Sequence, residues 1–193
     1  MAQSSQTISG QKTFKSAITV SEGATFTATG GVYKITAAST SLANLAVRDL
    51  ITVTGTTNNN ATFTVKSVDT NGTYVIVEEV VTAESSDGST DTVLTYSGFV
   101  TDKYKGDGYY SQADGIHTVA YHVNTTCTGA IKMQGSLATT PTEDDWFDIT
   151  GTTFTTDLST TISSNNFTGN FVWVRAKCTA NTAGSVTKIL YNN

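Results

Sequence analysis

The sequence predicts an all-β protein with an extended N-terminal arm, a small β-barrel-like domain and a C-terminal β-sandwich of the jelly-roll type. Thr fills about a fifth of the 193 positions, and its branched Cβ favours strands over helices. Short alternations of apolar and polar residues recur along the chain between turns rich in Gly, Asn and Asp. Evenly spaced short strands of this kind are typical of sandwiches and barrels.

Residues 1–30 are predicted to form the extended arm. Its stretch QTISGQKTFKSAITV carries large apolar side chains that stand too far apart to pack against one another. Such a segment needs a partner surface, in another domain, another copy of the chain or another protein. We therefore expect it to dock through Ile8, Phe14, Ile18 and Val20.

Residues 31–100 predict the small β-domain. In ATFTVKSVDTNGTYVIVEEVV, two alternating runs flank the turn DTNG, whose Asn-Gly pair is the strongest short-range hairpin signal because both residues tolerate positive φ. VYKITA, DLITVT and TVLTYSGF predict further strands. SLANLAVRD predicts a helical turn in which Leu42, Leu45 and Val47 cover one end of the barrel.

Residues 101–115, TDKYKGDGYYSQADG, have no clean period and are expected to form a linker. Their carboxylates are compatible with a Ca²⁺ site, but the EF-hand pattern is missing, which favours a solvated loop. The tyrosines fit an interface between domains or subunits better than a ligand pocket. The residues concerned are Asp102, Asp107, Asp114, Tyr104, Tyr109 and Tyr110.

Residues 116–193 predict the sandwich, with strands at IHTVAYHV, GAIKMQGSL, WFDIT, FVWVRAKC and SVTKILY. In FVWVRAKC, the face ending at Cys178 is apolar and is expected to point into the core. Trp173 shares the opposite face with Arg175 and is therefore expected to be partly exposed. Cys127 and Cys178 are expected to be buried free thiols, with a cross-strand disulfide as the alternative.

The composition argues against several classes of function. A net charge of −5 with 11 Lys and Arg and no basic cluster makes nucleic-acid binding unexpected. There is no apolar run of about 18 residues that could span a membrane. His117 and His122 fall on opposite faces of one strand, so they cannot share a metal ion. Without a catalytic motif, we expect no enzymatic activity, no cofactor and no metal.

The segment TEDDWFD surrounds Trp146 with carboxylates. One reading is a Ca²⁺ site, or an aromatic platform with hydrogen-bonding carboxylates for a sugar. The other, which we favour, is a solvated turn whose Trp packs inward as a lid on the sandwich. The carboxylates are Glu143, Asp144, Asp145 and Asp148.

Three stretches carry a resemblance to one group of proteins. The arm resembles the short repeat of tail-fibre and other appendage proteins of tailed bacteriophages. DLITVTGTTNNNATFTVKSVDTNGTYVIVEEVV looks like a small β-domain of phage structural proteins, and the segment from GIHTVAYHV onwards is similar to a β-sandwich of marine and cyanobacterial phage virion proteins. The arm residues that match the repeat are Gln6, Thr7, Ile8, Gly10, Lys12, Thr13, Phe14, Ile18 and Val20.

The resemblance implies a structural, non-enzymatic virion protein, either a short fibre or appendage or a capsid decoration (cement) subunit. In such proteins the repeat is associated with parallel chains of a homotrimer, so the expected partners are further copies of this chain and capsid, neck or tail proteins. The expected location is the virion, after synthesis in the bacterial host cytoplasm, where thiols stay reduced.

The alternative function is a receptor- or glycan-binding module in the sandwich. GAIKMQGS followed by a Trp-containing strand resembles the galactose-binding-like domains. The candidate residues for a host surface glycan are Trp173, Trp146 and Arg175, of which Trp173 is the best placed for stacking on a sugar.

Overall fold

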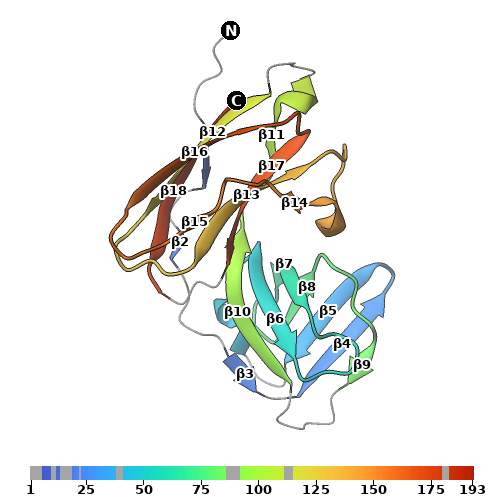
Figure 1. Cartoon of the computed structure of the whole chain (residues 1–193). Coiled ribbons are helices and arrows are strands. Elements are labelled where there is room, and N and C mark those ends of the chain that lie inside the picture. Colours follow the sequence, from blue (N-terminus) through green and yellow to red (C-terminus); the bar gives the residue numbers. More distant parts are fainter. Residues whose placement is uncertain are drawn as a thin grey trace. The chain divides into compact units, whose positions relative to one another are not determined.

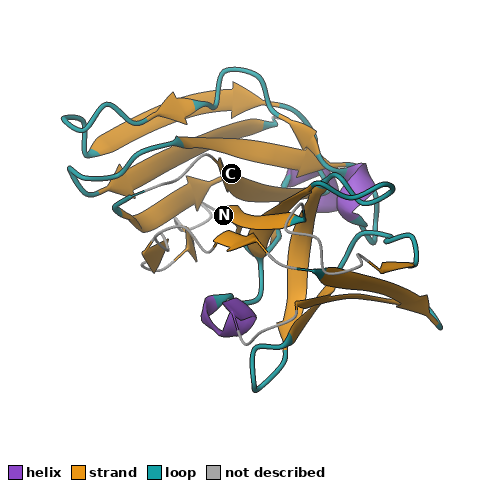
Figure 2. Cartoon of the chain, turned by 90° about the horizontal axis from the view of Figure 1, so that it is seen from below, coloured by secondary structure: helices purple, strands orange, loops and turns teal. Residues whose placement is uncertain are grey.

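The computed structural model describes residues 6–9, 12–13, 19–21, 23–37, 41–85, 92–110, 115–179 and 183–193, with the backbone alone described before residue 23. Strands and loops make up nearly all of the described chain, and its helical segments are short 3₁₀ turns (Figures 1 and 2). The all-β class is therefore confirmed. The chain divides into two compact units, here called unit 1 (1–14 and 100–193) and unit 2 (15–99).

Unit 2 is barrel-like. Its strand β7 pairs with β6 through its first half and with β8 through its second half, and its register shifts between Val65 and Ser67. A strand that changes partner at a bulge turns a corner between two sheets. The strand order is β3-β10-β6-β7-β8-β5-β4-β9. The elements are β3 (Thr19–Ser21), β4 (Ala24–Thr29), β5 (Val32–Ala37), η1 (Ser41–Asn44), β6 (Asp49–Thr54), β7 (Thr62–Val68), β8 (Tyr74–Val77), β9 (Glu84–Ser85) and β10 (Val93–Val100).

The predicted hairpin joins β7 to β8. Asp69 closes the turn by donating its N–H to the Tyr74 carbonyl at 3.0 Å and accepting the Gly72 N–H at 2.9 Å. Gly72 has a φ of +69° and lies against Ala43, where a Cβ would come within 2.4 Å. The hairpin therefore packs against η1. Leu42 of η1 is fully buried, as expected for a lid on the barrel.

The expected lid is only partly confirmed. Leu45 is 6% exposed and packs in the core with Leu42, but Val47 is 52% exposed. η1 ends at Asn44, and the backbone of Arg48 has a positive φ of 74°. Val47 therefore lies beyond the end of η1, on the surface.

Unit 1 is a sandwich of two antiparallel sheets. The first has the order β1-β18-β12-β16, with β2 also paired to β18. In the second, β13 lies between β17 and the short strands β14 and β15, and β11 pairs with β17. The elements are β1 (Gln6–Ser9), β2 (Lys12–Thr13), β11 (Tyr104–Lys105), η2 (Asp107–Tyr110), β12 (Ile116–Val123), β13 (Ala130–Ser136), η3 (Glu143–Asp145), β14 (Phe147–Asp148), β15 (Phe154–Thr155), β16 (Ile162–Thr168), β17 (Trp173–Thr179) and β18 (Ser185–Asn192).

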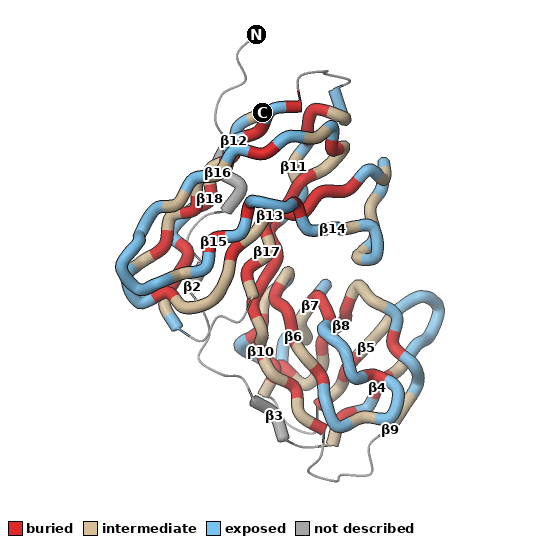
Figure 3. Tube along the Cα trace, in the orientation of Figure 1, coloured by how far each residue is buried: buried red, intermediate tan, exposed pale blue. Residues whose placement is uncertain are grey.

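Alternation along the strands builds the core of unit 1 (Figure 3). In β17, Val174, Ala176 and Cys178 are fully buried, which confirms the predicted core face. Both cysteines are buried free thiols, as predicted. Tyr121 of β12 is also fully buried, and its hydroxyl donates to the Thr152 carbonyl at 2.8 Å.

The units do not follow the predicted domain boundaries. The arm is divided: β1 and β2 belong to unit 1, whereas β3 and β4 belong to unit 2, where Ala24 and Phe26 are each 1% exposed. The described part of the expected linker 101–115 is built into unit 1, since the Thr101 N–H donates to the Ala176 carbonyl at 2.9 Å and β11 extends the same edge of β17. Backbone pairing along open sheet edges explains both differences.

Candidate functional site

The acidic turn, here residues 142–148, is organised around Arg175. The Arg175 guanidinium donates to both carboxylate oxygens of Glu143, at 2.8 and 2.7 Å, and its Nε donates to Gln134 at 2.9 Å. Its centre lies 4.2 Å from the ring centroid of Trp146. Arg175 is only 3% exposed. The side chain of this predicted glycan-binding residue therefore makes its contacts with Glu143, Gln134 and Trp146, inside the protein.

Two other carboxylates of the acidic turn, those of Asp145 and Asp148, also have partners within the protein. Asp145 accepts hydrogen bonds from the N–H and hydroxyl of Thr142, at 2.7 and 2.8 Å, and these bonds hold the pKa of its carboxyl below the usual value. Burial acts to raise the pKa of Asp148, but bonds from Lys132 and Gln134 outweigh it and lower that pKa. Across the described residues, no three His, Cys, Asp or Glu side chains gather where they could hold a metal ion. Trp146 is half-buried and lies against the Arg175 guanidinium, whereas Asp144 and Asp145 are exposed.

Trp173 lies in a different environment, here called the aromatic–lysine surface. Its half-buried ring lies 5.2 Å from that of Tyr109, which in turn lies 5.3 Å from that of Tyr110, in edge-on arrangements. Lys103 Nζ lies 4.6 Å from the centroid of the Trp173 ring, and Lys105 Nζ lies 4.0 Å from that of Tyr109. Both tyrosines are more than 40% exposed. The surface combines three aromatic rings with two ammonium groups.

Glycines position the tyrosines of this surface. Gly106 and Gly108 donate their N–H groups to the carbonyls of Val172 and Phe171, at 3.1 and 2.9 Å. A Cβ on Gly106 would come within 2.4 Å of the Phe171 carbonyl oxygen, and one on Gly108 within 2.6 Å of that of Asn170. Only residues without a Cβ allow this close backbone approach. The segment is therefore held tightly against the chain that leads into β17.

The sequence contains two signals for this surface. Lys103 and Lys105 are two positions apart, the spacing of residues on one face of a strand. The pattern Gly-Asp-Gly-Tyr-Tyr that follows predicts a close backbone approach and then two large rings. The pairing of Lys105 with Trp173 across β11 and β17 joins these elements. That pairing depends on tertiary structure.

His117 and His122 lie on opposite faces of β12, as predicted. His122 is partly exposed, and burial together with Lys188 lowers its pKa. His117 is fully buried. Its Nε2 lies 2.7 Å from the Gly169 carbonyl oxygen and its Nδ1 lies 2.8 Å from the Tyr191 hydroxyl.

These contacts specify the tautomer of the buried histidine. A carbonyl oxygen only accepts, so Nε2 carries a proton, and in the neutral imidazole the Tyr191 hydroxyl then donates to Nδ1. Asp107 Oδ2 lies 3.9 Å from Nε2, and the imidazole stacks on Phe167 with ring centroids 5.0 Å apart. Since His117, Asp107 and Tyr191 are all shielded from solvent, we interpret this cluster as structural.

The predicted docking residues fall partly outside the described chain. Phe14 and Ile18 lie outside it. Ile8 belongs to β1, which pairs with the edge of β18 at a register shift between Thr7 and Ser9. Val20 belongs to β3 and is the register partner of Leu94 in β10.

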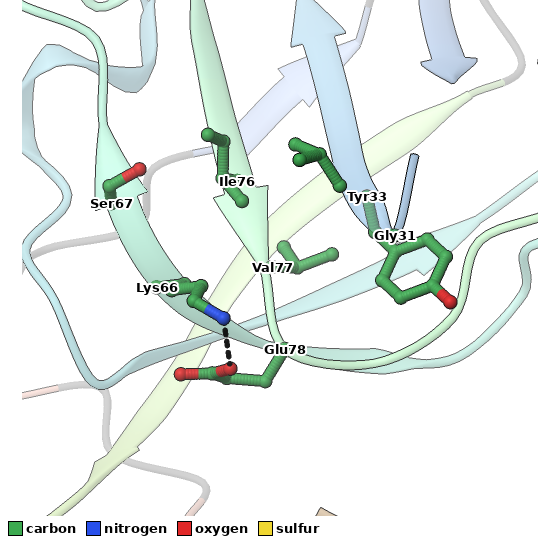
Figure 4. Close-up of a pocket in the computed structure, with 8 residues that line it drawn as sticks. Gly31, Tyr33, Lys66, Ser67, Ile76, Val77 and Glu78 are labelled. Carbon is green, nitrogen blue, oxygen red and sulfur yellow. Dashed lines mark ion pairs between the residues drawn. The ribbon is translucent and has the colours of Figure 1, made fainter. Parts of the chain in front are cut away.

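A pocket of about 280 Å³ lies in unit 2. Figure 4 shows Tyr33, Ile76 and Val77 on its walls and the ion pair between Lys66 and Glu78, whose charged atoms lie 3.1 Å apart. The volume lies below the usual range for ligand sites, and the ion pair is an ordinary exposed one. A second pocket, of about 520 Å³, lies in unit 1. Its lining residues are Phe147, Asp148, Ile149, Thr150, Asn166, Phe167, Thr168 and Phe171.

The comparisons with known proteins add no assignment. No family model matches the chain, and no curated protein matches it. Within the described residues, no helix is long and apolar enough to cross a membrane. Any function must therefore be argued from the residues themselves.

Proposed function

We propose that the chain is a non-enzymatic structural subunit of a tailed-phage particle, either a short fibre or appendage or a capsid decoration protein. The observation that carries the proposal is the resemblance of residues 6–20 to the fibre-type repeat. Its residues supply β1, β2 and β3, strands of 4, 2 and 3 residues on the sheets of two different units.

Such short edge strands suit a role in assembly. Each adds few backbone hydrogen bonds, and the edge that it covers fits the same strand of a second copy equally well. Exchange of an identical element between protomers is a low-cost route to an oligomer. In the proposed homotrimer, the arm of one protomer covers the sheet edges of another, and its apolar residues pack between chains.

The fold determines how this proposal must be tested. Deleting residues 1–30 would remove β4, whose Ala24 and Phe26 are in the core of unit 2. That truncation would unfold the unit and reveal nothing about docking. Substitutions that leave β4 intact are required.

The first experiment measures the oligomeric state of the full chain by sedimentation equilibrium. We expect a trimer for the natural sequence and a monomer with unchanged circular dichroism for the double variant Phe14→Ser/Ile18→Ser. Val47→Ser, at a surface position of unit 2, is the matched control and should remain trimeric. A monomeric natural chain, or a trimeric double variant, would contradict assembly through the arm.

The second experiment distinguishes the two kinds of particle subunit. Quantitative mass spectrometry of purified particles gives the copy number of this chain relative to the major capsid protein. Copies in the hundreds would indicate decoration of the head lattice. A few to a few dozen would indicate a neck, tail or vertex appendage, and absence from the particle would reject the proposal.

A second candidate function is glycan binding by unit 1. It is favoured by the half-buried Trp173 beside two exposed tyrosines, because aromatic faces stack on the apolar faces of sugar rings. A glycan array tests it. Bound glycans that Trp173→Ala no longer retains would support this function, and an array without signal would count against it.

A further inference from the structure

The aromatic–lysine surface has a chemical composition that points to one class of ligand. Its two lysines contact the rings: the Lys103 ammonium lies over Trp173, and the Lys105 ammonium lies over Tyr109 and Tyr110. Throughout the described part of the chain, neither ammonium forms an ion pair with a carboxylate. Within that part of the chain, no ion pair has to be broken before either ammonium can bind an anionic ligand.

The cation–π contacts keep the ammonium groups close to the rings without occupying their hydrogen-bonding capacity. A contact of this kind at an exposed site is worth about 0.5–1 kcal/mol, and an ammonium retains three donors. An anionic group can draw Lys105 away from Tyr109 at small cost, because a charge-assisted hydrogen bond is stronger than the contact it replaces. The same movement exposes the ring face.

The backbone beneath the surface is fixed. Gly106 and Gly108 lie against the Phe171 and Asn170 backbone, and Trp173 donates its Nε1–H to the Thr139 carbonyl at 3.1 Å. A backbone and a Trp173 ring held in this way lose little conformational entropy when a ligand binds. Three rings at 5.2–5.3 Å spacing provide apolar faces and edges for more than one sugar unit.

The charge balance also distinguishes this surface from a general polyanion-binding face. The protein carries a net charge of −5, so its overall field repels polyanions. The two ammonium groups must therefore act at short range. A ligand that fits combines an acidic group for each lysine with an apolar face for the rings.

We propose that the aromatic–lysine surface is a binding site for an acidic polysaccharide, whose carboxylate or sulfate groups pair with Lys103 and Lys105 while its sugar rings stack on Tyr109, Tyr110 and Trp173. This inference rests on the second candidate function, glycan binding. It specifies the class of glycan and replaces Arg175 and Trp146 as the residues responsible.

Isothermal titration calorimetry of the full chain tests the proposal with three polymers. Dextran sulfate and dextran share a neutral backbone and differ in sulfate, and alginate supplies carboxylates. We expect binding to dextran sulfate, alginate or both, weakening at high salt because the lysine contacts are exposed. Dextran should not bind. The acidic polymer that binds identifies the recognised group.

Variants separate charge from stacking. Lys103→Gln/Lys105→Gln should weaken binding by about tenfold or more, because it removes two charge-assisted contacts. Tyr109→Ser/Tyr110→Ser, which retains both lysines, should also weaken it severalfold. Lys34→Gln is the matched control, since Lys34 lies 5.0 Å from the centroid of the Tyr74 ring in unit 2, and it should bind like the natural chain.

The possible results have distinct meanings. Unchanged binding by either double variant would overturn the proposal, as would the failure of both acidic polymers to bind. If a neutral glycan from the array binds in a manner that depends on Trp173 but not on the lysines, the second candidate function stands and this inference fails. If no polysaccharide of any charge binds, both fail.

Discussion

The guanidinium of Arg175 and the carboxylate of Glu143, 32 positions apart in the chain, form a two-point ion pair with bonds of 2.8 and 2.7 Å. The Arg175 side chain is 4% exposed and that of Glu143 15%. Trp146 lies against the guanidinium. This pair ties the acidic turn to β17.

Glu143→Gln should destabilise the protein by about 2–3 kcal/mol, because it leaves a buried guanidinium without its counter-charge. Urea unfolding followed by tryptophan fluorescence measures the change. The control is Lys66→Gln, which breaks the exposed ion pair with Glu78 and should cost about 1 kcal/mol or less. Equal effects of the two substitutions would contradict the structural role of the pair.

Tyr191→Phe should cost about 1–2 kcal/mol, because it leaves the buried Nδ1 of His117 without its donor. Tyr110→Phe, at a surface position, should change stability by about 0.5 kcal/mol or less. ¹⁵N chemical shifts of the His117 imidazole provide an independent measurement. They should report a proton on Nε2, and a proton on Nδ1 at neutral pH would show that the hydrogen-bond assignment is wrong.

The buried Cys127 thiol should make stability depend on pH in the alkaline range. Burial raises its pKa from about 9 to about 11, so between these values the folded chain binds more protons than the unfolded chain. The free energy of unfolding should therefore fall as the pH rises from about 9 to about 11. Tyr121 and Tyr191, whose pKa values burial also raises, contribute in the same direction at higher pH.

The difference between the natural chain and Cys127→Ala isolates the contribution of the thiol. The substitution should reduce the fall in stability across this pH window, as measured by urea unfolding at several pH values. Both cysteines should also resist a thiol reagent in the folded protein and react after denaturation, since both are buried. Rapid modification of either thiol in the folded state would contradict the burial.

Gly106→Ala should destabilise unit 1 by about 1–3 kcal/mol, because its Cβ would overlap the Phe171 carbonyl and force the backbone apart. Gly151→Ala, which meets no atom within 4 Å but has a φ of +80°, should cost about 1–2 kcal/mol through backbone strain alone. Only Gly106→Ala should also weaken binding of acidic polymers. Full binding by Gly106→Ala would show that the glycine does not position the tyrosines.

The all-β class, the hairpin at residues 69–72, the core face of β17 and the buried thiols could all be predicted from the sequence. These features depend on local rules. Side chains alternate along a strand, an Asn-Gly pair favours one kind of turn, and an apolar face must be buried. They hold for almost any packing of the strands.

The tertiary structure decided what Arg175 and Trp173 do, although the two side chains lie on the same face of β17. Arg175 reaches the acidic turn and is buried there, whereas Trp173 lies beside residues 103–110 and remains half-exposed. The strand period fixes the face on which a side chain lies, but not which distant segment covers that face. Strand order and the path of the connecting segments determine which segment packs on each face. Both depend on contacts between residues far apart in the sequence.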